Sequence, residues 1–210
     1  MKTGLLIKIS ALVLLAAAGS ANATAQLVTN GGFENGQSGW NFNGNVKVTS
    51  GNVYAQYGWT DANYPNGNVA LFGAGDMAGG SIKQDLITVA GQTYALSFDY
   101  GAITGGGRPQ NLNVSVNDIS GPSIFTSQYT AYGTGSLAQL MTAYAFDFTA
   151  ISNETVINFA DANIANGNSI DATLDNVSVT PTAVPEPETY PLLLTGLVLM
   201  GLTLRTRQRK

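Results

Sequence analysis

The feature that most constrains the fold of this chain is a strict alternation of large apolar residues with small or polar ones over short segments. Within residues 93–100, every second position holds a large apolar side chain: Tyr94, Leu96, Phe98 and Tyr100. Because successive side chains of a β-strand point to opposite faces, this pattern predicts a strand with one apolar face. Residues 112–116 and 141–148 show the same alternation.

Six other segments have weaker strand patterns: residues 46–49, 53–57, 69–72, 81–88, 155–159 and 174–179. Turn-forming pairs such as Asn66-Gly67 and Asn166-Gly167 separate the segments. About nine or ten short strands with no helical pattern between them are typical of two packed sheets. We therefore expect an all-β fold, an antiparallel jelly-roll β-sandwich.

The N-terminus has the composition of a secretory signal peptide. Lys2 and Lys8 flank and enter an apolar run over residues 5–18, and two Ala-x-Ala sites follow, ending at Ala23 and Ala25. This arrangement predicts a signal peptide over residues 1–25 that is removed on export. The sandwich is then expected to occupy residues 26–180, the length of one ordinary domain.

The C-terminus has three parts of different chemistry. A Pro-rich linker over residues 181–189 precedes 15 uncharged residues at positions 190–204, and residues 205–210 carry four positive charges. An apolar run followed by Lys and Arg predicts a transmembrane helix at 190–204 with a basic cytoplasmic tail at 205–210. Fifteen helical residues span about 22 Å, less than the ~30 Å hydrocarbon core, so this helix would be a weak permanent anchor.

Charge and composition exclude several functions. The predicted domain has three basic and eleven acidic residues, so nucleic acid and anionic lipid are poor partners. The chain contains neither Cys nor His. Disulfides and Ser-His-Asp catalysis are therefore impossible, and a hard cation bound by oxygen ligands is the metal that this composition favours.

The tail resembles the PEP-CTERM sorting signal of Gram-negative bacteria. The motif itself is Val184-Pro185-Glu186-Pro187, followed in order by the apolar run and the basic end. The resemblance implies export across the inner membrane of such a bacterium. It also implies a membrane-tethered precursor and an exosortase, a membrane protease, as processing partner. The mature protein would then be at the cell surface or secreted.

The domain resembles the galactose-binding-like sandwiches, which include several families of carbohydrate-binding modules. The resemblance is carried, in order along the chain, by Asn30-Gly31-Gly32-Phe33-Glu34 with Ser38-Gly39-Trp40, by residues 67–72 and 89–98, and by Leu174-Asp175-Asn176-Val177-Ser178-Val179. The resemblance implies a structural calcium ion held by an early acidic residue and a late Asp, which here are Glu34 and Asp175. The alternative is that Glu34 caps a loop and that Asp175 accepts hydrogen bonds from a turn.

Aromatic and polar residues cluster in a turn-rich stretch before residue 67. Sugar rings stack on aromatic side chains while neighbouring polar groups bind their hydroxyls. The candidate carbohydrate-binding residues are Trp59, Asp61, Asn63 and Tyr64, with Arg108 from a separate glycine-rich loop. A core position is the alternative for Trp59 and is the prediction for Trp40.

Two functions remain open from the sequence, and no catalytic residue is predicted. The first is an exported surface or extracellular-matrix protein that binds exopolysaccharide. The second is a structural protein of the surface or biofilm matrix without a specific ligand. A polysaccharide-degrading enzyme is disfavoured because the domain has two Glu residues and no clustered acid pair of the kind that glycoside hydrolysis requires.

Overall fold

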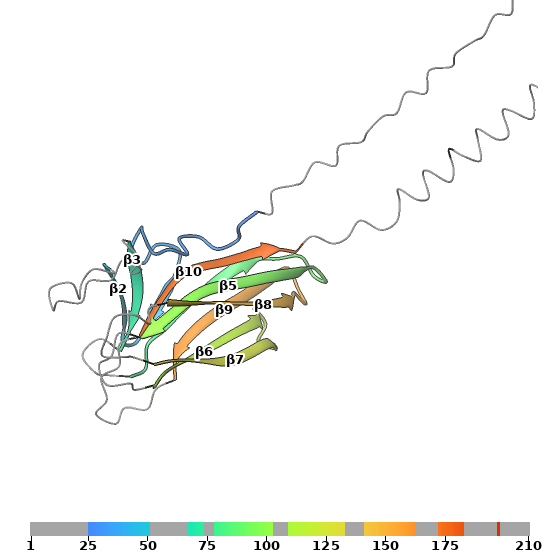
Figure 1. Cartoon of the computed structure of the whole chain (residues 1–210). Coiled ribbons are helices and arrows are strands. Elements are labelled where there is room, and N and C mark those ends of the chain that lie inside the picture. Colours follow the sequence, from blue (N-terminus) through green and yellow to red (C-terminus); the bar gives the residue numbers. More distant parts are fainter. Residues whose placement is uncertain are drawn as a thin grey trace, which may run out of the picture.

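The computed structural model describes residues 25–50, 67–73, 78–102, 109–132, 141–162 and 172–182, together with Leu197 (Figure 1). These residues form ten β-strands in two five-stranded antiparallel sheets, so the predicted jelly-roll β-sandwich is confirmed. The first sheet has the order β1-β4-β9-β6-β7 and the second has the order β2-β3-β10-β5-β8.

The first sheet is built from β1 (Asn41–Asn43), β4 (Ser81–Ile87), β9 (Glu154–Asp161), β6 (Pro109–Asp118) and β7 (Ser123–Tyr132). The second is built from β2 (Val46–Ser50), β3 (Asn68–Phe72), β10 (Ala172–Pro181), β5 (Thr93–Ala102) and β8 (Met141–Thr149). The long central strands run along the molecule, and β2 and β3 lie at one end of it (Figure 1).

The alternating segments supply the core between the sheets. The predicted apolar face of β5 is buried, as are Leu112, Val114 and Val116 of β6. Phe98 of β5 lies at the centre of this core, with ring centroids 5.1–5.5 Å from those of Tyr129, Tyr144 and Phe159. The core therefore joins both sheets through aromatic contacts.

The segment before β1 packs against the core through Phe33 and Trp40, whose ring centroids are 5.5 Å apart. Trp40 is buried, which confirms its predicted core position, and its indole N–H donates to the carbonyl oxygen of Asn30. The side chain of Asn30 donates to the carbonyl oxygens of Gly36 and Ser38 and accepts from the N–H of Asn35. Asn30 thus fixes the loop that carries the Asn-Gly-Gly-Phe-Glu sequence.

Two strands were not predicted. In β7 the inward residues Phe125, Ser127 and Tyr129 interrupt the apolar alternation with a hydroxyl, and β1 has only three residues. The predicted strand at 53–57, residues 1–24 of the predicted signal peptide and residues 183–210 of the tail, Leu197 excepted, lie outside the described residues. No helix among the residues placed by the structure is long and apolar enough to cross a membrane.

Candidate polysaccharide-binding face

Polar side chains cover the outer face of the β1-β4-β9-β6-β7 sheet. The strand register places one residue from each strand in a single row across it: Asn41, Lys83, Asn158, Ser115 and Thr126. The next row consists of Asn43, Ser81, Ala160, Asn113 and Gln128. These ten residues, nine of which are polar and one of which is Ala160, are called the polar face below. They alternate along their strands with buried residues such as Ile82, Leu112 and Phe159.

Hydrogen bonds between side chains hold part of this face in place. Gln128 Nε2 donates to Asn113 Oδ1 at 3.1 Å, and Asn158 Nδ2 donates to Ser115 Oγ at 3.5 Å. Beside them, Thr130 Oγ1 donates to Asn111 Oδ1 at 2.7 Å. Amides and hydroxyls fixed on a sheet lose little conformational entropy when they bind a ligand. The polar face is therefore suited to forming hydrogen bonds with the hydroxyl groups of a ligand.

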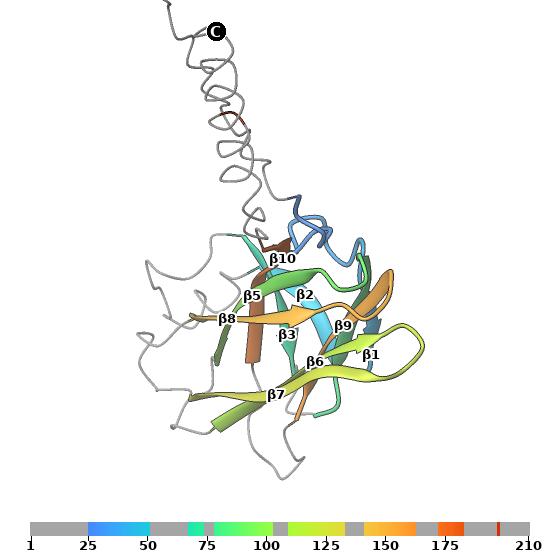
Figure 2. The ribbon, with the colours of Figure 1, turned by 90° about the vertical axis from the view of Figure 1, so that its right-hand side faces the viewer.

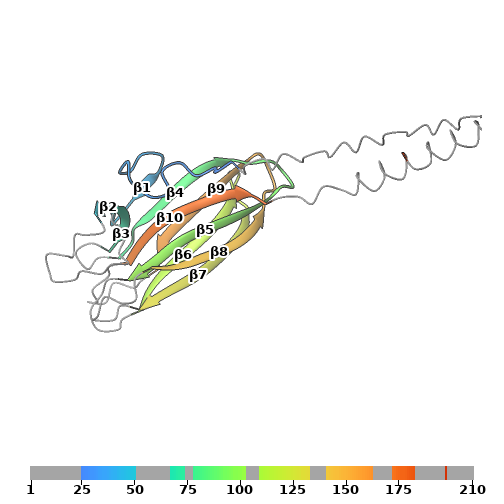
Figure 3. The same ribbon diagram turned by 45° about the horizontal axis from the view of Figure 1, so that its top comes forward.

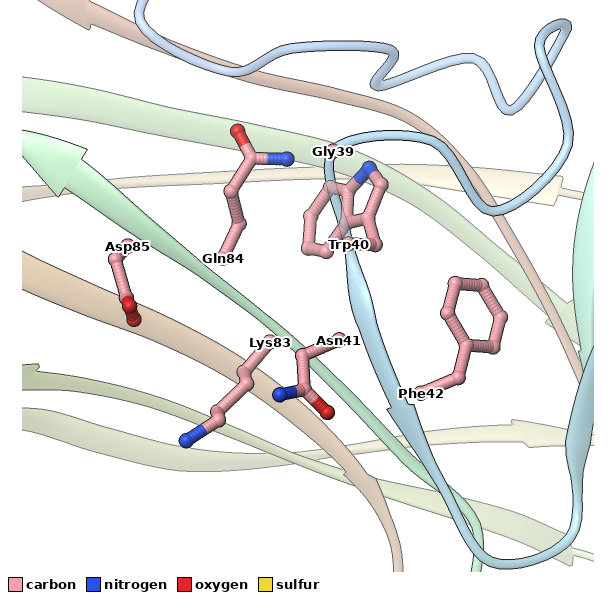
Figure 4. A pocket seen from close by; sticks show the side chains of 7 residues that line it. All are labelled: Gly39, Trp40, Asn41, Phe42, Lys83, Gln84 and Asp85. Atoms are coloured by element: carbon pink, nitrogen blue, oxygen red, sulfur yellow. The ribbon is translucent and has the colours of Figure 1, made fainter.

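A pocket of about 530 Å³ lies at the β1–β4 edge of the sheet (Figure 4). It is lined by Gly39, Trp40, Asn41, Phe42, Lys83, Gln84 and Asp85. Figure 4 shows the side chains of Lys83 and Asp85 on one side of β4 and that of Gln84 on the other, next to Trp40. Lys83 also lines a neighbouring hollow of about 390 Å³ with Asn43 and Ser81. Lys83 therefore connects the pocket to the polar face.

Gln84 has a structural role in the wall of this pocket. Its side chain is buried, its Nε2 donates to the carbonyl oxygen of Thr29 at 2.9 Å, and its Oε1 accepts from the N–H of Thr29 at 2.7 Å. This paired contact attaches the N-terminal segment to the edge of β4 opposite β9, where among the described residues β1 pairs with β4 only over Ser81–Lys83. The ligand-facing groups of the pocket are therefore those of Asn41, Lys83 and Asp85.

An exposed aromatic residue stands at one corner of the same sheet. Tyr132 pairs with Pro109 at the end of β7, and 51 % of its surface is exposed. Its side chain follows Gln128 and Thr130 on the outer side of the strand. Sequence reasoning missed Tyr132 because β7 was not predicted, although the alternation Thr126, Gln128, Thr130, Tyr132 was a usable signal.

The two predicted calcium ligands lie close to one another. Asp175 is 3 % exposed, and its Oδ1 accepts from the N–H of Asn176 at 2.7 Å. Burial raises the pKa of Asp175 to about 6, the hydrogen bond from Asn176 opposes this rise, and the carboxylates of Asp99 and Glu34 add to it. Glu34 Oε1 accepts from the N–H of Asn68 at 3.1 Å. Such hydrogen bonds are expected if Glu34 caps a loop and Asp175 accepts from a turn, which is the alternative to a metal site.

The described residues do not bring together a larger set of metal-ligating side chains. Within the described ranges, no group of three or more Asp and Glu residues could hold a metal ion. Calcium at Glu34 and Asp175 would therefore need further oxygens, such as backbone carbonyls.

The remaining predicted site residues lie outside the part of the chain that the structure describes. They are Trp59, Asp61, Asn63, Tyr64 and Arg108, and the sorting motif Val184, Pro185, Glu186 and Pro187. Arg108 directly precedes Pro109, the residue that pairs with Tyr132.

The sequence matches the model of a known protein family over most of its length. The sequence model of a family described as "Protein of unknown function (DUF642)" matches residues 19–180. The chain belongs to the DUF642 family. In this DUF642 protein the PEP-CTERM protein-sorting motif also matches, over residues 183–210, which confirms the predicted sorting signal. The motif marks the chain as an exported, membrane-anchored sorting substrate. No curated protein matches the sequence.

Solved structures share the sandwich of this DUF642 domain at low sequence identity. The arabinose-bound MgGH51 α-L-arabinofuranosidase matches with a TM-score of 0.55 and 14 % identity, over 81 % of this chain and 28 % of the enzyme chain. TmCBM61 in complex with β-1,4-galactotriose matches with a TM-score of 0.50 and 16 % identity, over 76 % of this chain and 100 % of the module.

The CBM22-1 xylan-binding domain of Paenibacillus barcinonensis Xyn10C gives a TM-score of 0.50 at 15 % identity, over 79 % of this chain and 99 % of that domain. The DUF642 protein thus spans about a quarter of the enzyme chain but the whole length of the two modules. The resemblance to the fold of carbohydrate-binding modules is confirmed.

Proposed function

We propose that the domain binds an extracellular polysaccharide on the polar face. The observation that carries the proposal is the row Asn41, Lys83, Asn158, Ser115 and Thr126, with one polar side chain from each of five adjacent strands. Strands lie about 4.8 Å apart, so the row extends for roughly 19 Å. That length suits several consecutive sugar rings of a chain rather than one monosaccharide.

Two chemical features of the face support this ligand class. Amides and hydroxyls supply both donors and acceptors, which matches the hydroxyl groups of a sugar. Tyr132 offers an exposed ring for stacking at the corner of the sheet. Lys83 and Arg108 would favour a polysaccharide that carries carboxylates. Trp59, Asp61, Asn63 and Tyr64, which lie outside the described residues, remain proposed contributors.

The structural relatives also support the proposal. TmCBM61 is complexed with β-1,4-galactotriose, and the CBM22-1 domain is xylan-binding. Both are binding modules of the same fold, and we propose no catalytic activity for the present domain. The second candidate remains a structural protein of the surface or biofilm matrix, favoured by the sorting signal alone.

Affinity electrophoresis of the full-length protein in detergent tests the proposal. The gels contain the exopolysaccharide of the source organism, β-1,4-galactan or xylan. The unsubstituted protein should be retarded by at least one of them, and the double variant Lys83→Ala/Asn158→Ala should bind about thirtyfold more weakly, since each of the two lost polar contacts costs about 1 kcal/mol. The matched control is Thr142→Ala/Asp147→Ala, which removes two exposed side chains from β8 on the other sheet.

Three outcomes would contradict the proposal. Equal retardation of both double variants would exclude the polar face as the binding site. No retardation of the unsubstituted protein would favour the structural candidate. Release of reducing sugar from any of the polysaccharides would show an enzyme instead.

Processing by an exosortase and a structural calcium ion complete the proposed function. We propose cleavage near Val184-Pro185-Glu186-Pro187, which mass spectrometry of the mature protein would locate. Deletion of residues 205–210 should disturb this processing while the domain still folds. We also propose that Glu34 and Asp175 hold calcium, because a cation would relieve the mutual repulsion of the carboxylates around Asp175.

A further inference from the structure

Four exposed aliphatic side chains gather at one end of the sandwich. They are Ile87 (75 % exposed), Val89 (62 %), Ile119 (47 %) and Ile151 (56 %), and they are called the aliphatic tip below. Ile87 ends β4 and Val89 lies in the β4–β5 turn, whereas Ile119 and Ile151 lie in the β6–β7 and β8–β9 turns. Among the described residues, only Tyr132 and Leu197 are other large hydrophobic side chains with comparable exposure.

Hydrogen bonds hold the three turns of the aliphatic tip together. The N–H of Thr88 donates to the carbonyl oxygen of Asn153 at 2.9 Å, and the N–H of Ile119 donates to that of Glu154 at 3.3 Å. The hydroxyls of Thr88 and Thr155 lie 3.0 Å apart in a buried contact beneath the turns. The turns that carry the aliphatic side chains are therefore held in fixed positions relative to one another.

The sorting tail leaves the domain at this same end. Thr182 follows β10, its N–H donates to the carbonyl oxygen of Thr93 at 2.9 Å, and its own carbonyl oxygen accepts from Gln92 Nε2 at 3.1 Å. Gln92 and Thr93 directly follow the β4–β5 turn that carries Val89. Figure 3 shows the end of β10 beside this turn, and Figure 2 shows the molecule from that end.

The length of the tail limits how far this end can be from a membrane. Tyr190, the first residue of the uncharged run, comes eight residues after Thr182. Eight fully extended residues span at most roughly 26–29 Å. A chain anchored through residues 190–204 therefore keeps Thr182, at the end of the domain that carries the aliphatic tip, within that reach of the bilayer, whereas β2 and β3 lie at the far end of the domain.

We propose that the aliphatic tip inserts into the bilayer interface while the precursor is tethered. The partner is the lipid surface itself, and the contact is apolar. The charged described residues in or beside the three turns are Asp85, Asp118 and Glu154, all acidic, and the two described lysines lie in β2 and at position 83. Anionic lipid should therefore not strengthen the contact.

A spin label on the full-length protein in phosphatidylcholine vesicles tests this proposal. Because the chain has no Cys, Ala90→Cys provides a single labelling position within the exposed β4–β5 turn. The label at position 90 should be accessible to oxygen in the bilayer and protected from a water-soluble nickel chelate. A label introduced by Lys47→Cys on β2 should remain accessible to the chelate.

Substitution of the aliphatic tip provides the matched comparison. The combined variant Ile87→Ser/Val89→Ser/Ile119→Ser/Ile151→Ser should raise the chelate accessibility of position 90 at least about fivefold, because the apolar contact is removed. Tyr132→Ser, which removes an equally exposed ring at the other end of β7, should leave it unchanged. Equal melting temperatures in detergent would show that the combined variant is folded.

The following results would overturn the proposal. Position 90 could be as accessible to the chelate as position 47. Its protection could persist in detergent and increase with protein concentration, which would show contact between copies of the chain. Protection found only in native membranes would show a protein partner, and protection that requires phosphatidylglycerol would show an electrostatic contact.

Discussion

Gly31 packs directly against the backbone of Val177, so the first loop of the domain touches its last strand. A Cβ atom added to Gly31 would lie 1.9 Å from the carbonyl oxygen of Val177, and the N–H of Val177 donates to the carbonyl oxygen of Gly31 at 3.0 Å. This contact gives the Asn-Gly-Gly-Phe-Glu sequence a physical reason: the second residue of the motif has no room for a side chain.

Gly31→Ala should therefore lower the free energy of unfolding by at least about 1–3 kcal/mol, as overpacked sites do. Gly32→Ala is the matched control, because a Cβ at Gly32 would meet only Asp175 Oδ1 at an ordinary distance of 3.8 Å. Urea unfolding followed by tryptophan fluorescence measures both. Equal destabilisation by the two substitutions would contradict the account of the Gly31 contact.

Tyr100→Phe should stabilise the domain or leave it unchanged, within about 1 kcal/mol. The hydroxyl of Tyr100 is fully buried and has no hydrogen-bond partner in the described structure, so its removal costs no native interaction. Tyr94→Phe is the control, because the hydroxyl of Tyr94 accepts from the N–H of Val89 at 2.8 Å. That substitution should cost about 1 kcal/mol. In thermal melts the melting temperature should therefore fall for Tyr94→Phe and rise or stay the same for Tyr100→Phe.

In the presence of a chelator, the stability of the domain should fall as the pH rises from about 4 to about 7. The pKa of Asp175 is about 6 in the folded state and about 3.9 in an unfolded chain, so the folded state holds the proton more tightly. The contribution of Asp175 is therefore fully present below about pH 4 and lost above about pH 6.

Asp175→Asn should flatten this part of the pH profile and raise stability at neutral pH by an amount on the order of 1–3 kcal/mol. Asp147→Asn, at an exposed position in β8, is the control for changes in net charge. Urea midpoints measured across the pH range provide the comparison. Parallel profiles for the unsubstituted protein and Asp175→Asn would show that burial does not shift this carboxyl group.

Calcium should raise the melting temperature of the domain, and a chelator should reverse the rise. A ligand at a hundredfold excess over its Kd stabilises by about 2.7 kcal/mol, which for a domain of this size corresponds to several degrees. Glu34→Gln and Asp175→Asn should each abolish the response, while Asp147→Asn should retain it. Identical melting temperatures in calcium and in chelator would exclude the proposed ion.

Several features of this protein were predictable because they depend on local sequence. Period-two alternation at Tyr94, Leu96, Phe98 and Tyr100 fixes which side chains share a face, whatever the strand pairs with. The order of Pro-Glu-Pro, apolar run and basic end is likewise contiguous, so the sorting signal was recognised from the sequence. The strand β7 escaped prediction because Ser127 lies between Phe125 and Tyr129 on its inner face.

The candidate site was not predictable, because it depends on register between strands far apart in the chain. Asn41, Lys83, Asn158, Ser115 and Thr126 come from five separate segments, and a shift of one residue in any strand would turn its side chain into the core. The exposure of Ile87, Val89, Ile119 and Ile151 has the same origin. The sequence by itself determined which residues of a strand share an apolar face that can be buried. It also determined that the chain carries a sorting signal at its C-terminus. Only the tertiary structure decided which polar residues form a row and which aliphatic residues stay in contact with solvent, because both depend on long-range pairing and packing.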